Sequence, residues 1–152
     1  MSTAAATQSG QGILFATFQV RDALCALDAA SVQEVIRVGP VTPVNYASKE
    51  VVGIFNLRGR IVTIVDIGQR LGFAPAVPGP ESRIFIIEDR GEFIGILVDR
   101  VDEVVEVEQG EWQAPPANVN GLQATYLKGV CRSGGRVITL LHGARLLAEE
   151  SR

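Results

Sequence analysis

Carboxylates are concentrated in one stretch of the sequence, between residues 99 and 111. The stretch contains six acids, Asp99, Asp102, Glu103, Glu106, Glu108 and Glu111. Oxygen-rich clusters can bind divalent cations, and a pair of carboxylates can act as acid and base in hydrolysis. All six acids come from one short segment, however, and no second group of His, Cys or Asp offers to complete a coordination shell. The stretch therefore favours a solvated strand edge over a metal site or a hydrolase centre.

Other residue types that carry catalysis are scarce. His142 is the only histidine, and it stands at the end of an apolar stretch before a short expected helix, where capping is its expected role. The sequence has no GxSxG, GxxxxGK[ST], HExxH or GxGxxG motif. Cys25 and Cys131 lack CxxC spacing and stand in apolar surroundings, as small core residues of a reducing compartment do. We therefore expect a protein that is not an enzyme and that binds neither a metal nor a cofactor.

Charge and hydropathy narrow the choice of partners. The chain has 14 Lys plus Arg and 17 Asp plus Glu, a net charge of −3, and no long basic run. Nucleic-acid binding by a small β-barrel is therefore a weak alternative. No apolar run approaches the roughly 20 residues of a membrane-spanning helix. Residues 1–11 lack the features of a signal peptide, so we expect a disordered lead and a cytoplasmic protein.

Apolar stretches of strand length recur along the chain. We expect strands at 13–20, 23–27, 51–57, 61–67, 83–88, 93–98, 104–107, 126–131 and 137–141. Turn sequences such as Arg58-Gly59 and Ser133-Gly134-Gly135 separate several of them and are typical of hairpins. Short helices are expected at 30–37, 67–71 and 143–149. Residues 74–81, with three prolines and a glycine, are expected to link two halves.

The two halves contain a diverged internal repeat. Residues 53–65 align with 129–141 at an offset of 76, and two glycines, an arginine and a threonine coincide. Residues 32–38 align with 101–107 at an offset of 69, with three valines and a glutamate identical. Both patterns recur in the same order, which favours a duplicated β-module over chance matching of valine-rich strands. The offset grows from 69 to 76 between the earlier and the later aligned block, which predicts a longer loop at 109–123 in the second half.

The stretch 61–67 is apolar on both faces, because Ile61 and Val65 alternate with Val62 and Ile64. Both faces of such a strand are covered when each half forms a small closed barrel that packs against the other. We therefore predict one all-β domain over 12–150, made of two pseudo-repeated five-stranded barrels that share a hydrophobic core, with a few short helices. The first barrel is expected at 12–73 and the second at 82–150.

Five motifs make the sequence similar to the CheW coupling-protein family, from about residue 12 to residue 147. They are VQEVI at 32–36, VGIFNLRG at 52–59, IVTIVD at 61–66, GILVD at 95–99 and YxxG at 126–129. The resemblance implies five-stranded, SH3-like barrels, in agreement with the repeat. The same fold occurs in the regulatory domain of the CheA kinase, but 152 residues leave no room for the ATP-binding and dimerisation parts of a kinase.

The resemblance also implies a function. It is that of a non-enzymatic scaffold that couples chemoreceptors to the histidine kinase CheA in bacterial chemotaxis signal transduction. The implied partners are the cytoplasmic tip of a chemoreceptor and the regulatory domain of a CheA-type kinase, with no nucleic acid and no direct membrane insertion. A cytoplasmic location with recruitment to membrane receptor arrays follows. An adaptor of a non-flagellar pathway, such as pilus motility, is the alternative.

The hairpin turns distinguish candidate site residues from scaffold. Arg60 and Arg136 coincide in the repeat, which favours a shared structural or surface role, whereas Arg58 aligns with Gly134. The hairpin therefore does not require an arginine at position 58. A guanidinium on a rigid hairpin can bind a carboxylate or the carbonyls of a helix. Arg58 is the leading candidate for receptor binding, and a solvent-exposed turn arginine is the alternative.

Other site residues follow from the resemblance. The receptor-binding set is completed by Val32, Glu34, Val35 and Val98. The kinase-binding set is Asn56, Gly59 and Gly129. Because Val32 and Val35 recur as Val101 and Val104, core positions are the alternative for both valines.

Overall fold

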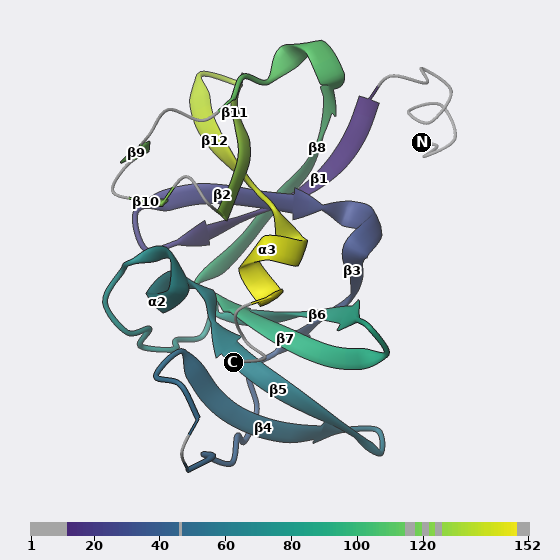
Figure 1. Ribbon diagram of the computed structural model, residues 1–152, viewed down its shortest axis with the longest axis vertical. Coiled ribbons are helices and arrows are strands. Elements are labelled where there is room, and N and C mark those ends of the chain that lie inside the picture. The colour runs from purple at the N-terminus through teal and green to yellow at the C-terminus, as the bar shows by residue number, and fades with distance from the viewer. Residues whose placement is uncertain (1–11, 46, 115–117, 120–121, 124–125, 149–152) are drawn as a thin grey trace.

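Two five-stranded sheets dominate the computed structural model, and a short two-stranded sheet lies beside them (Figure 1). The structure describes residues 12–45, 47–114, 118–119, 122–123 and 126–148. The expected lead at 1–11 lies outside the described residues. The two large sheets form SH3-like subdomains, so the predicted all-β fold class is confirmed.

We call the two subdomains barrel A and barrel B. Barrel A consists of β1 (Gly12–Val20), β2 (Ala23–Asp28), β8 (Arg100–Glu108), β11 (Leu127–Ser133) and β12 (Arg136–Leu141). Barrel B consists of β3 (Val32–Arg37), β4 (Val51–Leu57), β5 (Arg60–Asp66), β6 (Arg83–Asp89) and β7 (Glu92–Val98). The strand orders are β11-β12-β2-β1-β8 in barrel A and β3-β6-β7-β5-β4 in barrel B.

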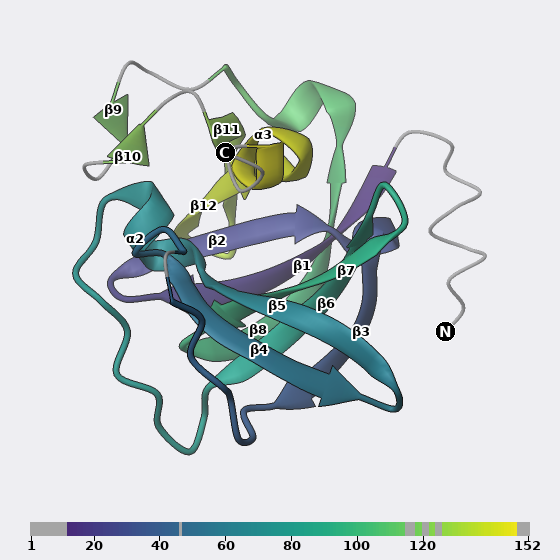
Figure 2. The same cartoon turned by 60° about the horizontal axis from the view of Figure 1, so that its bottom comes forward.

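Neither barrel coincides with one half of the sequence. The hairpin β1–β2 belongs to the first half but pairs with strands of the second half in barrel A, and the hairpin β6–β7 is exchanged in the opposite sense into barrel B (Figure 2). The barrel bounds 12–73 and 82–150 are therefore wrong. The internal repeat identifies equivalent strands, but the assignment of a hairpin to a barrel depends on long-range pairing that a repeat does not encode.

The exchange preserves the repeat in detail. In barrel B, Thr63 of β5 pairs in parallel with Ile94 of β7. In barrel A, Thr139 of β12 pairs in parallel with Cys25 of β2. Thr139 follows Thr63 by 76 residues and Ile94 follows Cys25 by 69, the two offsets of the sequence repeat. Replacing each strand by its equivalent thus converts one sheet into the other with the same register.

Short helices and one small hairpin complete the fold. One α-helix follows the last strand of each half, α2 (Ile67–Leu71) after β5 and α3 (Gly143–Ala148) after β12. The remaining elements are the 3-10 helices η1 (Ala29–Ser31) and η2 (Gln109–Glu111) and the paired strands β9 (Asn118–Val119) and β10 (Leu122–Gln123). Within the described part of the chain, no helix has the length and apolar character needed to cross a bilayer.

The helix expected at 30–37 is wrong, because most of this range forms β3. Val32, Val35 and Ile36 have a spacing of three and four that imitates a helix, but β-branched side chains suit a pleated sheet, and β6 supplies the pairing partners. Burial along β3 alternates, with Val32, Glu34 and Ile36 half-buried. The carboxylate of Glu34 thereby belongs to the inner face, a position that its polarity alone would not suggest.

The core has three parts. One cluster fills barrel A around Phe15, Ile138 and Leu140, and another fills barrel B around Val62, Ile84 and Ile86. The largest cluster lies between the barrels and combines residues of both, including Phe18 of β1 and Phe85 of β6, whose ring centroids are 5.1 Å apart. The predicted shared core is thus present, and the exchanged hairpins form much of it.

Candidate functional site

Arg58 and Glu34 form an ion pair across the open end of barrel B. Arg58 Nη1 donates to Glu34 Oε2 at 3.2 Å, and Nη2 donates to Oε1 at 2.5 Å. This fork geometry orients both side chains, although 68% of the Arg58 side chain stays exposed to solvent. The hydrogen bond to Glu34 raises the pKa of Arg58 above its ordinary value. A fixed cation on the surface is suited to binding a polar group of another protein.

The turn between β4 and β5 holds Arg58 in an unusual backbone conformation. Arg58 has φ 51° and Gly59 has φ 89°, the left-handed pair that a two-residue hairpin turn requires. Asn56 fixes this turn, because its Oδ1 accepts from the Gly59 N–H at 2.7 Å. A residue with a Cβ is strained at such φ values, and glycine is not. The hairpin alone would therefore favour glycine at position 58.

Barrel A forms the corresponding ion pair with a different arginine. Its turn consists of Gly134 and Gly135, both at positive φ. Arg136 Nη1 lies 3.2 Å from Asp102 Oδ2, and Arg136 Nη2 lies 3.7 Å from Glu103 Oε2. The hydrogen bond from Arg136 lowers the pKa of Asp102. An arginine that joins the hairpin to the facing strand is thus common to both barrels, but only barrel B carries it on the turn.

A hollow of about 260 Å³ lies beside the Arg58–Glu34 pair. We call it the mouth of barrel B and define it by its lining residues, Gln33, Glu34, Leu57, Arg58, Arg60, Ile86 and Phe93. Apolar side chains therefore contribute to the lining next to charged ones. The guanidinium carbon of Arg60 lies 4.4 Å from the centroid of the Phe93 ring, a cation–π contact.

The structure places the predicted receptor-binding valines in three different environments. Val35 is exposed at 45% on the outer face of β3, and Val32 is half-buried against the shared core. Val98 is fully buried, with 0% of its surface exposed. A rigid partner cannot reach the Val98 side chain, so Val98 belongs to the core and not to a binding surface.

Gly129, predicted to bind the kinase, is explained by packing. It is buried in β11 where the segment before β9 crosses, and a Cβ there would lie 2.6 Å from Trp112 Cδ1 and 2.8 Å from the Gln113 carbonyl oxygen. The matching Gly53 is crossed in the same way, because its Cβ would lie 2.3 Å from the Thr42 carbonyl oxygen. Both glycines permit a close backbone approach, and Gly129 presents no side chain to a partner.

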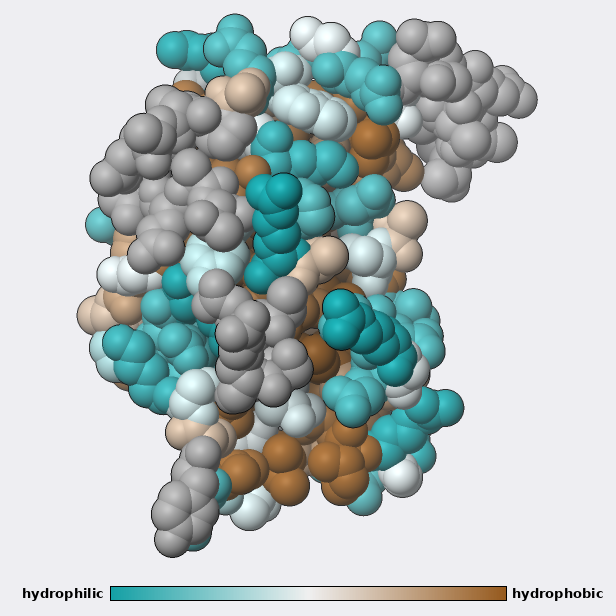
Figure 3. All heavy atoms as spheres, viewed as in Figure 1, coloured by the Kyte–Doolittle hydropathy of each residue, from teal (hydrophilic) through white to brown (hydrophobic). Residues whose placement is uncertain are grey.

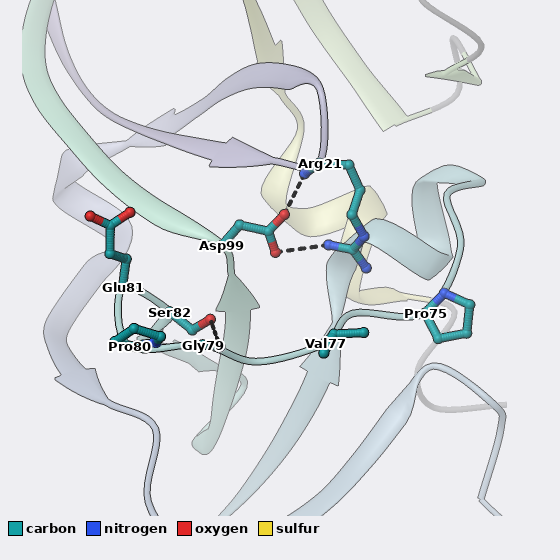
Figure 4. Close-up of a pocket in the computed structure, with 8 residues that line it drawn as sticks. All are labelled: Arg21, Pro75, Val77, Gly79, Pro80, Glu81, Ser82 and Asp99. Carbon is teal, nitrogen blue, oxygen red and sulfur yellow. Dashed lines mark hydrogen bonds and ion pairs between the residues drawn. The ribbon is translucent and has the colours of Figure 1, made fainter.

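A second charged cluster surrounds Arg21, at the turn between β1 and β2. The backbone N–H of Arg21 donates to Asp99 Oδ2 at 2.6 Å, and its guanidinium donates to Asp99 Oδ1 at 3.0 Å (Figure 4). Arg21 Nη2 also donates to both oxygens of the buried Asp66 and to the Ala74 carbonyl. The connector from 72 to 82 runs past this cluster and borders a hollow of about 530 Å³. Arg21 thus fastens the connector to both barrels.

The other residues that could do chemistry have structural roles. Within the described residues, no three His, Cys, Asp or Glu side chains are grouped to hold a metal ion. The backbone N–H of Arg145 donates to His142 Nδ1 at 3.4 Å, so the histidine caps α3 as expected. Cys25 and Cys131 are buried and free. Burial raises the pKa of the Cys25 thiol to about 12.

Some surface residues near the mouth of barrel B were not predicted from the sequence. Ile61 is exposed at 60%, although the apolar pattern of 61–67 predicts a strand with both faces covered. Arg60 and Phe93 were not singled out as site residues, and their pairing joins β5 to β7. In Figure 3, apolar side chains gather at the lower end of the molecule, over β4 and β5. The unusual apolar character of both faces of the stretch 61–67 was the available signal for this surface.

Comparison with known proteins gives consistent matches over nearly the whole chain. The family model of the CheW-like domain matches residues 14–151. The chemotaxis protein CheW of Treponema pallidum is 32% identical over 138 residues, which are 88% of this chain and 81% of that protein. The chemotaxis protein CheW of Rhizobium meliloti is 29% identical over 152 residues, which are 100% of this chain and 98% of that protein.

A solved structure supports the same assignment. The crystal structure of the scaffolding protein TtCheW from Thermoanaerobacter tengcongensis superimposes with a TM-score of 0.79 at 27% sequence identity. The superposition covers 86% of this chain and 84% of that one. The twin barrels, the motifs and the family match agree, and this chain belongs to the CheW-like domain family of chemotaxis adaptor and scaffold proteins.

Proposed function

We propose that this protein is a non-enzymatic scaffold that couples chemoreceptors to a CheA-type histidine kinase. Membership of a family of scaffold proteins supports the absence of a catalysed reaction. The protein acts in the cytoplasm and is recruited to receptor arrays at the membrane through its partners. Its work is to hold two proteins in a fixed relation, for which two barrels with a shared core provide a rigid body.

The observation that carries this proposal is the oriented Arg58–Glu34 pair at the mouth of barrel B. The turn conformation at Arg58 is strained for an arginine, and the equivalent turn of barrel A uses glycine. An exposed guanidinium that an ion pair orients and that the turn does not need points to a role in binding. Together with the exposed Val35 and the half-buried Val32, this pair forms the receptor-binding surface.

The turn residues Asn56 and Gly59 serve the second partner, the regulatory domain of the kinase. Asn56 holds the turn through the Gly59 N–H, and the exposed apolar Ile61 follows directly. An interface of ordinary size buries roughly 1,200–2,000 Å² in total, more than one turn can supply. The kinase therefore contacts β5 beyond the turn as well.

An Arg58→Glu substitution tests the receptor surface. The variant should fold normally, because the turn does not need an arginine, and it should lose both binding to a receptor-tip fragment and receptor-dependent activation of the kinase. Arg132→Glu on β11 of barrel A is the matched control, because it makes the same charge change at another exposed arginine. Full receptor-dependent activation by Arg58→Glu would remove Arg58 from the site.

A further inference from the structure

Arg60 is an exposed arginine whose guanidinium donors have no hydrogen-bond partner in the described part of the chain. Within the described residues, its guanidinium lies over the face of the Phe93 ring, with the guanidinium carbon 4.4 Å from the ring centroid. This contact fixes the position of the charge and leaves the edge of the guanidinium open. Arg58 is paired with Glu34 on the same hollow. Arg60 therefore contributes the uncompensated positive charge at the mouth of barrel B.

In barrel A, the arginine equivalent to Arg60 has its charge paired with carboxylates. Arg136 is the equivalent of Arg60 at the offset of 76, and it forms ion pairs with Asp102 and Glu103 at 3.2 and 3.7 Å. Both acids lie on β8, the strand that corresponds to β3. In barrel A, this chain itself thus supplies both carboxylates that pair with the arginine.

Barrel B has the equivalent arginine, but neither of the two equivalent positions offers it a free carboxylate. The residue equivalent to Asp102 is Gln33, which carries no charge. The residue equivalent to Glu103 is Glu34, and Arg58 occupies its two oxygens. Nothing in the described part of barrel B replaces them. The position left by the missing carboxylate adjoins a hollow of about 260 Å³ with apolar side chains in its lining.

We propose that Arg60 binds a carboxylate side chain of the chemoreceptor tip, and that an apolar side chain next to this carboxylate fills the hollow beside Phe93. The partner thereby supplies in trans the acid that barrel A carries in cis. The identity of the partner rests on the proposed function, because Arg58 and Glu34, assigned to the receptor, line the same hollow. Charge complementarity requires an acidic segment, and the Leu57 and Ile86 side chains favour an apolar neighbour.

The test measures the affinity of the full chain for a cytoplasmic tip fragment of a chemoreceptor from the same genome. Isothermal titration calorimetry compares the wild type with Arg60→Glu, Arg60→Met and the control Arg132→Glu. We expect Arg60→Glu to weaken binding about tenfold or more, because it removes a charge-assisted hydrogen bond and adds a repulsion. Arg60→Met keeps the side-chain stem over Phe93 and should weaken binding less than Arg60→Glu but more than twofold. Arg132→Glu should stay within about twofold of the wild type.

A reversal experiment identifies the carboxylate. Exchanging one acid of the tip fragment for arginine should restore binding to Arg60→Glu and weaken binding to the wild type. If the wild type binds the tip and neither Arg60 variant weakens binding more than the control, Arg60 is not part of the interface, while the proposed function stands. If the wild type does not bind the tip, the proposed function itself fails. Circular dichroism of each variant establishes folding, and the Arg60→Met result decides if Arg60→Glu does not fold.

Discussion

Arg21→Met removes the cation that joins the hairpin β1–β2 to the connector and to both barrels. The side chain of Arg21 is 17% exposed, and that of its partner Asp66 is 1% exposed. Methionine retains an unbranched apolar stem but provides no donor. The substitution therefore tests whether the exchanged hairpin is fastened by this charged cluster or held by apolar packing alone.

The expected loss in the free energy of unfolding depends on the hydrogen bonds that Asp66 retains. Removing one partner of a buried ion pair costs about 3–5 kcal/mol when the remaining charge has no compensation. Asp66 still accepts from the Gly68 N–H at 3.1 Å, from Gln69 Nε2 at 3.0 Å and from the Ala76 N–H at 2.7 Å. These donors compensate part of the charge, so we expect a loss of about 2–3 kcal/mol in the free energy of unfolding.

Urea denaturation followed by circular dichroism measures this loss, and the chain contains its own control. Arg90 stands 69 residues after Arg21, at the turn between β6 and β7, with φ 56° against 50° for Arg21. It is exposed, so Arg90→Met should change the free energy of unfolding by no more than about 0.5 kcal/mol. Hydrogen exchange of the Ala76 amide should also become faster in Arg21→Met alone. Equal denaturation midpoints for the two variants would refute a fastening role for Arg21.

Three further predictions concern the turn at Arg58, the buried Gly129 and the Cys25 thiol. Arg58→Gly copies the turn of barrel A and should keep the urea midpoint of the wild type while weakening receptor-tip binding about tenfold or more in calorimetry; a lowered midpoint would make Arg58 a structural residue. Gly129→Ala should lower the free energy of unfolding by about 1–3 kcal/mol in urea titrations, since its Cβ would overlap Trp112; unchanged stability would contradict the packing explanation. Cys25, whose pKa is raised to about 12 by burial, should not react with a disulfide reagent at pH 8 until urea unfolds the chain; rapid reaction of the native protein would contradict its burial.

Much of the fold could be predicted because the sequence repeats itself. Equivalent strands could be identified because Gly53, Gly59, Arg60 and Thr63 recur 76 positions later. In the structure, Thr63 pairs with Ile94 as Thr139 pairs with Cys25, each in a parallel ladder. The exchange of hairpins was not predictable from this signal. Either assignment of β1–β2 to a barrel buries the same apolar residues, and the choice depends on strand pairing between distant parts of the chain.

The site was only partly predictable for a related reason. Arg58 could be singled out because its equivalent is Gly134, but its ion pair with Glu34 was seen only in the structure. Val98 could not be separated from the surface valines, because apolar residue type does not distinguish a buried strand from an exposed face. Arg60 was assigned a shared role with Arg136, and only the contacts show that the two arginines differ in their partners.

The assembly of three purified components tests the proposed coupling role most directly. The chain, a receptor-tip fragment and the regulatory domain of the CheA-type kinase from the same genome are mixed and analysed by size-exclusion chromatography with light scattering. The proposed coupling role predicts that the chain binds each partner alone and joins both in one ternary complex, without altering either covalently. A chain that stays separate from both partners at micromolar concentrations would contradict it.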